Sequence, residues 1–290
     1  MGDLKTIIIT GANSGLGFET AKKIAKNQNY QIILACRNKE KAEKAREDII
    51  KETSNQNVKV MILDTSSLKS VRSFVEEYKE SNIGKIYALI CNSGINGSNT
   101  GLTFDGFDIV FETNHLGHFL LANLLLPFIE ENGKVFVVSS DMHNPPMGNL
   151  KWIGTEKLAH PDNTLASNTI RYSYSKLCNL YFVYELARRL EQESKQIFVN
   201  AFNPGLMQTN FQNINFLSIQ YVKHMMPERL GDLDKSSKAL AELIVNDDLV
   251  KKSGQYYDRS INTCDSSDLS YNIDNAKELW DKSEFYTNNL

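Results

Sequence analysis

The 290-residue chain has only four cysteines, and none of them forms a Cys-x-x-Cys pair. Cys36, Cys91, Cys178 and Cys264 stand far apart, so the sequence predicts neither a disulfide framework nor a zinc site. Scattered single thiols are typical of proteins in a reducing compartment. We therefore expect reduced cysteines and a cytoplasmic protein.

The chain also has no excess of positive charge, since it contains 32 Lys and Arg residues and 35 Asp and Glu residues. The resulting net charge of −3 argues against nucleic acid as the main partner. The longest apolar run, residues 119–128, is shorter than the roughly 20 residues that a membrane-spanning helix needs. The first strand is expected close to Met1, which leaves no room for a signal peptide. We expect a soluble protein without an integral membrane segment.

No linker, internal repeat or low-complexity stretch divides the chain, so residues 1–290 are expected to form one domain. Apolar strand-like runs alternate with amphipathic segments along the whole length. Strands are predicted at 7–9, 31–36, 58–63, 86–91, 135–138, 198–202 and 254–258. Helices are predicted at 19–27, 39–52, from 67 onward, and at 114–130, 172–189, 236–245 and 274–285, with 141–170 as a surface excursion. This order predicts an α/β fold: a Rossmann-type, doubly wound parallel sheet of about seven strands with helices on both faces.

Ligands of such sheets bind beyond the carboxyl ends of the strands. The residues at the predicted strand ends should therefore converge on one crevice, although they are far apart in sequence. They are Gly11, Arg37, Asp64, Asn92, Ser140 and Pro204.

The first strand end carries a glycine-rich turn, Gly11-Ala-Asn-Ser-Gly15-Leu-Gly17. A turn between a strand and a helix lets the backbone approach a pyrophosphate, whose charge lies at the helix N-terminus. The spacing is Gly-x-x-x-Gly-x-Gly and not the Gly-x-Gly-x-x-Gly of the commoner dinucleotide fingerprint. A tight strand–helix connection without a ligand would give the same pattern, so the turn alone leaves both interpretations open.

A tyrosine and a lysine four residues apart, Tyr172 and Lys176, open the long predicted helix. They should lie on one helix face, one turn from each other. An ammonium beside a phenol stabilises the phenolate, so we expect the pKa of Tyr172 to fall from its usual value of about 10. The phenol could then act as general acid or base in an alcohol–carbonyl interconversion. The same spacing is also common among surface neighbours.

Together these motifs resemble the short-chain dehydrogenase/reductase family from end to end. Thr10-Gly11-Ala-Asn-Ser-Gly15-Leu-Gly17 is similar to the family's cofactor turn, and Asn92-Ser93-Gly94 to its second glycine motif. Four residues fall in order on its catalytic tetrad: Asn114, Ser140, Tyr172 and Lys176. Pro204-Gly205 and Thr209 are similar to the segment that closes over the nicotinamide. The resemblance implies an enzyme that uses a nicotinamide dinucleotide.

Finer features resemble the branch that holds retinol dehydrogenases and light-dependent protochlorophyllide reductases. Residues 34–37, 113–120 and 174–179 carry this resemblance, and the stretches 252–256 and 276–280 are similar to the reductases. Leu206 occupies a position where that resemblance implies a functional cysteine, and the 141–170 excursion contains no cysteine. Both departures count against protochlorophyllide reduction.

The resemblance also implies a role for each tetrad residue. Tyr172 exchanges a proton with the substrate oxygen while hydride moves to or from nicotinamide C4, and Lys176 binds the nicotinamide ribose and lowers the pKa of the tyrosine. Ser140 polarises the carbonyl, and Asn114 joins a water chain to solvent, with a helix cap as its alternative role. The cofactor contacts that the resemblance implies are Gly11, Asn13, Ser14, Gly15, Leu16, Gly17, Asn92, Ser93, Gly94, Tyr172, Lys176, Pro204, Gly205 and Thr209.

Arg37 follows the second strand, where an acidic residue would bind the adenosine ribose of NAD. An arginine can instead pair with the 2′-phosphate of NADP, so NADPH/NADP is the predicted cofactor and NAD the less favoured one. The alternative for Arg37 is a solvated surface side chain. Asp64 and Thr65 are predicted to lie beside the adenine.

Two further features are interpreted more simply. His115 and His118 are three residues apart on a predicted helix, but no acid or cysteine accompanies them, so both are predicted to be packing residues and no metal is expected. Residues 206–232 are apolar and contain adaptable methionines, and are interpreted as a lid over a lipophilic substrate. A core helix and contact with a membrane surface are the alternatives for this segment.

The sequence thus predicts an NADP-dependent oxidoreductase that interconverts a carbonyl and an alcohol, on a retinal-like, steroid-like or other lipophilic aldehyde or ketone. One alternative is a protochlorophyllide reductase-like enzyme that reduces a carbon–carbon double bond. Another is a non-catalytic protein that senses or binds a dinucleotide, since fold does not dictate function. A homodimer and a monomer are both compatible with the sequence.

Overall fold

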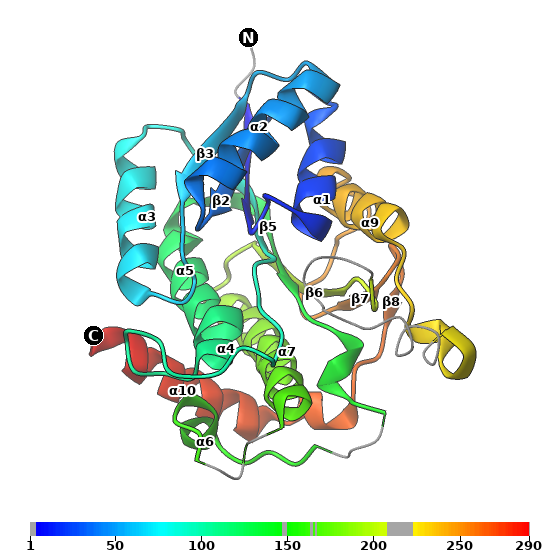
Figure 1. Ribbon diagram of the computed structural model, residues 1–290. Helices are drawn as coiled ribbons and strands as arrows, with labels where there is room; N and C mark the ends of the chain where they lie inside the picture. Colours follow the sequence, from blue (N-terminus) through cyan, green and yellow to red (C-terminus); the bar gives the residue numbers. More distant parts are fainter. Residues whose placement is uncertain (1–3, 147–149, 163–164, 166, 208–222, 290) are drawn as a thin grey trace.

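One eight-stranded sheet organises the protein, with the strand order β3-β2-β1-β4-β5-β6-β7-β8 (Figure 1). The computed structural model describes residues 4–146, 150–162, 165, 167–207 and 223–289. The strands are β1 Lys5–Thr10, β2 Tyr30–Cys36, β3 Val58–Ile62, β4 Ile86–Cys91, β5 Ile129–Val138, β6 Phe198–Asn203, β7 Tyr256–Asp258 and β8 Thr263–Cys264. All pairings from β3 to β7 are parallel, and only the two-residue β8 runs antiparallel. The predicted doubly wound α/β fold is confirmed, with this short edge strand added.

Helices cover both faces of the sheet (Figure 1). One face packs against α1 Gly15–Ala25, α2 Lys39–Thr53 and α9 Leu233–Val245. The other packs against α3 Leu68–Glu80, α5 Gly117–Leu125 and α7 Asn168–Gln192, with α10 Ile273–Asn288 lying outside α7. The short helices α4 Ile109–Phe111 and α6 Thr155–Ala159 lie in the connections.

The central strand shows why the sheet is buried on both sides. Ile7 and Ile9 of β1 belong to the core on the α1 side, whereas Ile8 belongs to the core on the α7 side, and all three are fully buried. Burying an isoleucine side chain stabilises a fold by about 1.5–3 kcal/mol. The absence of a polar face in β1 is therefore explained by helices above and below it.

The helix predicted at 114–130 is the main local error. The chain instead forms a π-helix at Glu112–Leu116, then α5, then a 3₁₀ turn at Leu126–Phe128. Pro127 has no backbone N–H and ends the helix early, which frees residues from Ile129 onward to join β5. Helix α7 also begins at Asn168, four residues before Tyr172, and the excursion before it contains α6.

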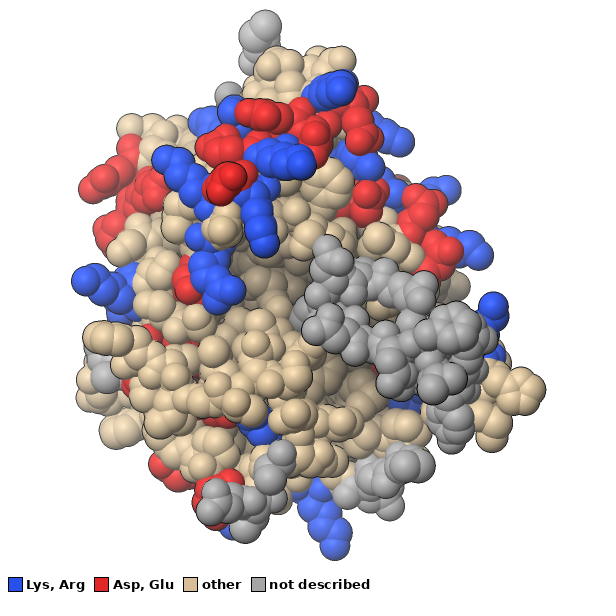
Figure 2. Space-filling view, in the orientation of Figure 1, with Lys and Arg blue, Asp and Glu red and all other residues tan. Residues whose placement is uncertain are grey.

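The face drawn in Figure 2 carries intermixed side chains of both charges, concentrated over its upper part near α1 and α2. Among the described residues, no helix combines the length and hydropathy that crossing a membrane requires.

Substituting Gly117 should destabilise the fold, because this glycine lets α5 lie directly on the end of β3. A Cβ at Gly117 would be 2.1 Å from the Thr65 carbonyl oxygen, so the helix would have to move away. Overpacking of this kind costs about 1–3 kcal/mol, and we expect Gly117→Ala to lower the free energy of unfolding in urea by that amount. Asn123→Ala on the same helix is the control and should change it by less than about 0.5 kcal/mol. Equal effects of the two variants would contradict the close contact.

Candidate active site

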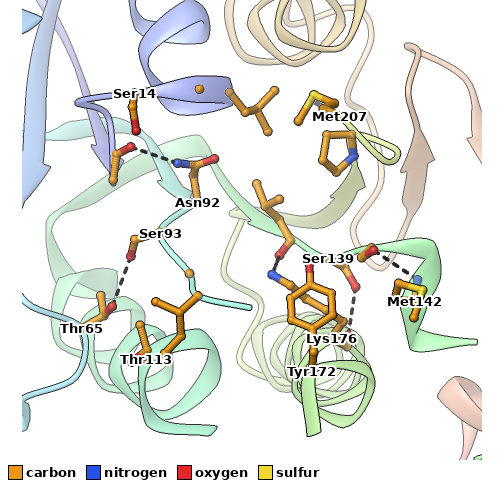
Figure 3. Close-up of a pocket in the computed structure, with 18 of the residues that line it drawn as sticks. Ser14, Thr65, Asn92, Ser93, Thr113, Ser139, Met142, Tyr172, Lys176 and Met207 are labelled. Carbon is orange, nitrogen blue, oxygen red and sulfur yellow. Dashed lines mark hydrogen bonds between the residues drawn. The ribbon is translucent and has the colours of Figure 1, made fainter. Parts of the chain in front are cut away.

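The carboxyl ends of the strands open onto one cavity of about 420 Å³ (Figure 3). It lies where the strand order reverses between β1 and β4, the usual ligand position in such sheets. Most of the predicted site residues line it: Gly11, Asn13, Ser14, Gly15, Leu16, Arg37, Asp64, Thr65, Asn92, Ser93, Gly94, Ser140, Tyr172, Lys176, Pro204 and Gly205. Gly17 and Asn114 are not among the lining residues, and Thr209 lies outside the described residues.

The glycine turn has the features of an anion site. Helix α1 begins at Gly15, and the side chain of its N-cap residue Ser14 makes no capping hydrogen bond. The N–H groups of the first helical turn are therefore left for another acceptor, and a pyrophosphate suits them in charge and geometry. Gly17 has a packing role, since a Cβ there would be 2.6 Å from Asn92 Nδ2.

Hydrogen bonds join the ends of β1, β3 and β4 into one cradle. Asn92 N and Ser93 N each donate to Thr10 Oγ1 at 2.8 Å, and Asn92 Nδ2 donates to the Thr10 carbonyl at 2.8 Å. The hydroxyls of Ser93 and Thr65 are 3.2 Å apart (Figure 3). Thr10 is therefore an organising residue of the site, although the sequence indicated it only as part of the turn motif.

Two cations lie at the end of the cavity beside β2. Arg37 is largely exposed, and its Nη1 is 3.9 Å from Asp64 Oδ2. Lys41, in the first turn of α2, also lines the cavity. Sequence reasoning missed Lys41, although its position four residues after Arg37 at a helix start was an available signal.

Tyr172 and Lys176 lie side by side in the cavity (Figure 3). Ser140 also lines it and follows β5, which β1 and β4 separate from β2. Lys176 is 3% exposed, and its Nζ donates to the Val138 carbonyl at 3.0 Å and lies 5.5 Å from the centroid of the Tyr172 ring. Ser140 Oγ accepts a hydrogen bond from Met142 N at 3.1 Å. Tyr172 and Lys176 thus belong to α7, and Ser140 follows the end of β5. The last residue of β5, Val138, also accepts the hydrogen bond of Lys176.

The predicted fall in the pKa of Tyr172 is wrong for this structure. Burial raises the pKa of the phenol above its usual value of 10, Asp141 adds to the rise, and a hydrogen bond with Ser140 offsets it only in part. Burial also lowers the pKa of Lys176 to about 8. Desolvation disfavours both charges and outweighs the attraction between ammonium and phenolate that helix spacing suggested. At neutral pH the site therefore holds a neutral phenol and a charged lysine.

Asn114 does not line the cavity, and its side chain is held by partners from two neighbouring segments. Its Oδ1 accepts from Ile95 N at 2.7 Å, while its Nδ2 donates to the Ile95 carbonyl and to Ser175 Oγ, both at 2.9 Å. The side chain therefore clamps the loop after β4 to α7, and it sits within the π-helix and not at a helix cap.

A third wall of the cavity is mostly apolar. It contains Met142, Pro146, Leu206, Met207 and Met226, and Asp141 and Arg229 also line the cavity. Apart from the interpretation of residues 206–232 as a lid, the sequence predicted no binding role for these side chains. Most of residues 206–232 lie outside the described residues. The two described ends are joined, because Leu206 N donates to the Arg229 carbonyl and Gly231 N to the Leu206 carbonyl, each at 2.8 Å.

The two histidines do not share a ligand position. His115 Nε2 lies 3.0 Å from Ser283 Oγ, and its ring packs among Phe111, Phe119 and Phe182. His118 Nε2 lies 2.9 Å from Thr10 Oγ1. Within the described part of the chain, no group of three or more His, Cys, Asp and Glu side chains could hold a metal ion.

Replacing Glu112 should stabilise the protein at alkaline pH. This carboxyl is fully buried in the π-helix. Burial, together with Asp105, raises its pKa from 4.5 to about 9. The folded state therefore binds more protons than the unfolded state between these values, and stability falls as the pH rises through that window. We expect Glu112→Gln to raise the free energy of unfolding by about 2 kcal/mol at pH 8 and by little at pH 5.

Urea unfolding at the two pH values measures this effect, with Glu47→Gln on the exposed side of α2 as the control. A gain for Glu112→Gln that is the same at both pH values would show that the buried carboxyl does not titrate in this window.

Comparison with known proteins agrees with this geometry. A family model described as short chain dehydrogenase matches residues 5–159. The chain is 40% identical over 210 residues to the WW domain-containing oxidoreductase of Gallus gallus, covering 70% of this chain and 49% of that protein. It is 34% identical over 259 residues to human retinol dehydrogenase 13, covering 88% of this chain and 76% of that protein.

Among solved structures, an uncharacterized protein from Mycobacterium paratuberculosis matches with a TM-score of 0.78 and 31% identity, covering 98% of this chain and 93% of that one. The chain spans about half the length of the first curated relatives it matches. The family model covers more than half of the chain and the retinol dehydrogenase covers most of it. The chain therefore belongs to the short-chain dehydrogenase/reductase family, in the branch of the retinol dehydrogenases.

Proposed function

We propose that the protein is an NADP-dependent oxidoreductase that interconverts a carbonyl and an alcohol on a lipophilic substrate. The observation that carries this proposal is that one cavity is lined both by Tyr172, Lys176 and Ser140 near the end of β5 and by Arg37 and Lys41 near the end of β2, with β1 and β4 between these strands. A dinucleotide has the shape and charge to span these two ends, with its pyrophosphate at the open N-terminus of α1.

The two cations support NADP over NAD. A 2′-phosphate beside Arg37 and Lys41 would gain charge-assisted hydrogen bonds, and the planar guanidinium is well suited to bind phosphate oxygens. The ribose of NAD would offer these cations only hydroxyls. Asp64, 3.9 Å from Arg37, supplies a carboxylate that can accept from an adenine or ribose donor.

The tetrad side chains supply what hydride transfer needs from the protein. The bound nicotinamide supplies or accepts the hydride. Tyr172, neutral at physiological pH, donates its phenolic proton to the developing alkoxide, and Ser140 orients and polarises the carbonyl by a hydrogen bond. Lys176 would bind ribose hydroxyls and stabilise the phenolate left after proton transfer. The hydrogen bonds of the Asn114 side chain fix the separation between α7 and the loop that follows β4.

The apolar wall supports a lipophilic substrate. Met142, Leu206, Met207 and Met226 line the same cavity as Tyr172, and methionine adapts to varied apolar shapes. The relationship to a retinol dehydrogenase supports the same substrate class.

The test is NADPH oxidation over a panel of aldehydes and ketones that includes retinal and steroid ketones, with NADPH binding measured separately. Turnover of an apolar member supports the proposal and begins to define the substrate. Binding of NADPH without turnover of any member would favour a dinucleotide-sensing protein. A protein that binds neither NADPH nor NADH would contradict the interpretation of the cavity as a dinucleotide site.

A further inference from the structure

His118 stands at the centre of the cradle although it lines no part of the cavity. It lies in α5, is 1% exposed, and meets three partners. Its Nε2 is 2.9 Å from Thr10 Oγ1 and 3.1 Å from Ser93 Oγ, and its Nδ1 is 3.3 Å from the Asn114 carbonyl oxygen. One buried ring therefore touches the ends of β1 and β4 and the π-helix that carries Asn114.

The hydrogen bonds of Thr10 fix the protonation state of this ring. Thr10 Oγ1 accepts two backbone N–H groups, from Asn92 and Ser93, which uses both of its lone pairs. Its own proton must therefore be donated, and among the described residues His118 Nε2 is the acceptor within reach. Nε2 then carries no hydrogen, so the proton of the neutral imidazole is on Nδ1 and is donated to the Asn114 carbonyl.

The surroundings favour this neutral form. Burial is the main cause that lowers the pKa of His118 to about 4, and the charge of nearby Lys176 acts in the same direction. The ring therefore keeps its role as acceptor for Thr10 and donor to Asn114 throughout the physiological pH range. A charged ring would place an N–H against the Thr10 hydroxyl and would break the cradle.

We propose that His118 is a positioning residue for the dinucleotide site, which orients the Thr10 hydroxyl and thereby holds the loop after β4 and the turn after β1 at the separation the cofactor needs. The same ring ties this cradle to the catalytic segment through Asn114. This role rests on the proposed NADP-dependent function. It differs from the packing role that we expect for His115. His115 lies one turn earlier, and its Nε2 contacts Ser283 of α10 instead of the cradle.

His115 offers a matched control, because both histidines are 1% exposed and neutral. We expect His118→Phe to raise the Kd for NADPH about tenfold or more, since it removes the acceptor of a buried hydroxyl and the donor to a buried carbonyl. His115→Phe should change the Kd by less than about threefold. His118→Gln can place an amide oxygen near the position of Nε2 and should restore most of the affinity, whereas His118→Asn is too short to reach Thr10.

Amide hydrogen exchange gives a readout that does not depend on the cofactor. The N–H groups of Asn92 and Ser93 should exchange faster in His118→Phe than in His115→Phe, because their acceptor on Thr10 is no longer oriented. Equal exchange in the two variants would overturn the positioning role, as would a His118→Gln variant that binds NADPH as weakly as His118→Phe. A wild-type protein that does not bind NADPH would overturn the proposed function instead, and the exchange comparison would still decide the role of His118.

Discussion

Tyr172→Phe should reduce kcat for carbonyl reduction at least about a hundredfold while leaving NADPH affinity within about threefold of the wild type. The reason is chemical. The variant keeps the aromatic ring and its packing in α7, but it removes the phenol that we propose as the proton donor to an alkoxide beside Ser140. An alkoxide that must take its proton from water loses the positioning that makes general acid catalysis effective.

Tyr174→Phe is the matched control for this variant. Tyr174 lies two residues further along α7, does not line the cavity, and donates from its hydroxyl to the Lys151 carbonyl at 2.6 Å. Its loss should affect stability more than turnover, so kcat should remain within about twofold of the wild type. Comparable losses of kcat in the two variants would indicate that a perturbed helix, and not a missing proton donor, explains the effect.

The double variant Arg37→Ala, Lys41→Ala should lose most of its preference for NADPH. Each side chain is expected to make a charge-assisted hydrogen bond to the 2′-phosphate, and such bonds contribute about 1.5–3 kcal/mol. Arg37 is 68% exposed, so solvent weakens the contribution, and we expect about a tenfold rise in Kd per residue. The Kd for NADH, which has no 2′-phosphate, should change by less than about threefold in the same variant.

Lys44→Ala provides the control, because this lysine is exposed on α2 and does not line the cavity. Titrations by fluorescence at low and high salt separate a specific contact from a general loss of positive charge, which screening would suppress. Parallel losses of NADPH and NADH affinity in the double variant would contradict recognition of the 2′-phosphate.

The sequence predicted the fold well because its strands are strongly marked. β2 and β4 are almost entirely apolar, and β1 contains three consecutive isoleucines, so the strands and the residues that follow them could be located from composition. Polar residues between Glu130 and Lys134 hid the first half of β5, where only Ile129 pairs with β4 before a register shift and regular pairing begins at Lys134. Such pairing is a tertiary effect that local patterns do not record.

The positions of site residues that depend on the backbone could be predicted from the sequence, but a pKa that depends on burial could not. Strand ends placed Gly11, Asn92 and Ser140 correctly in one cavity, since a parallel sheet brings these ends together. The pKa of Tyr172 could not be predicted in the same way, because desolvation depends on all the atoms around the phenol. The role of His118 was hidden for a related reason, since its partners Thr10 and Ser93 are distant in sequence.

The most direct test of the account is transfer of deuterium from NADPH labelled at nicotinamide C4 to a carbonyl substrate found in the panel. Mass spectrometry and NMR of the product should show one deuterium on the former carbonyl carbon with one of the two stereoisomers of the labelled cofactor, and Tyr172→Phe should slow this transfer without changing its position. An alcohol product without deuterium from either stereoisomer would contradict hydride transfer, and a label on a carbon of a reduced carbon–carbon double bond would contradict carbonyl chemistry.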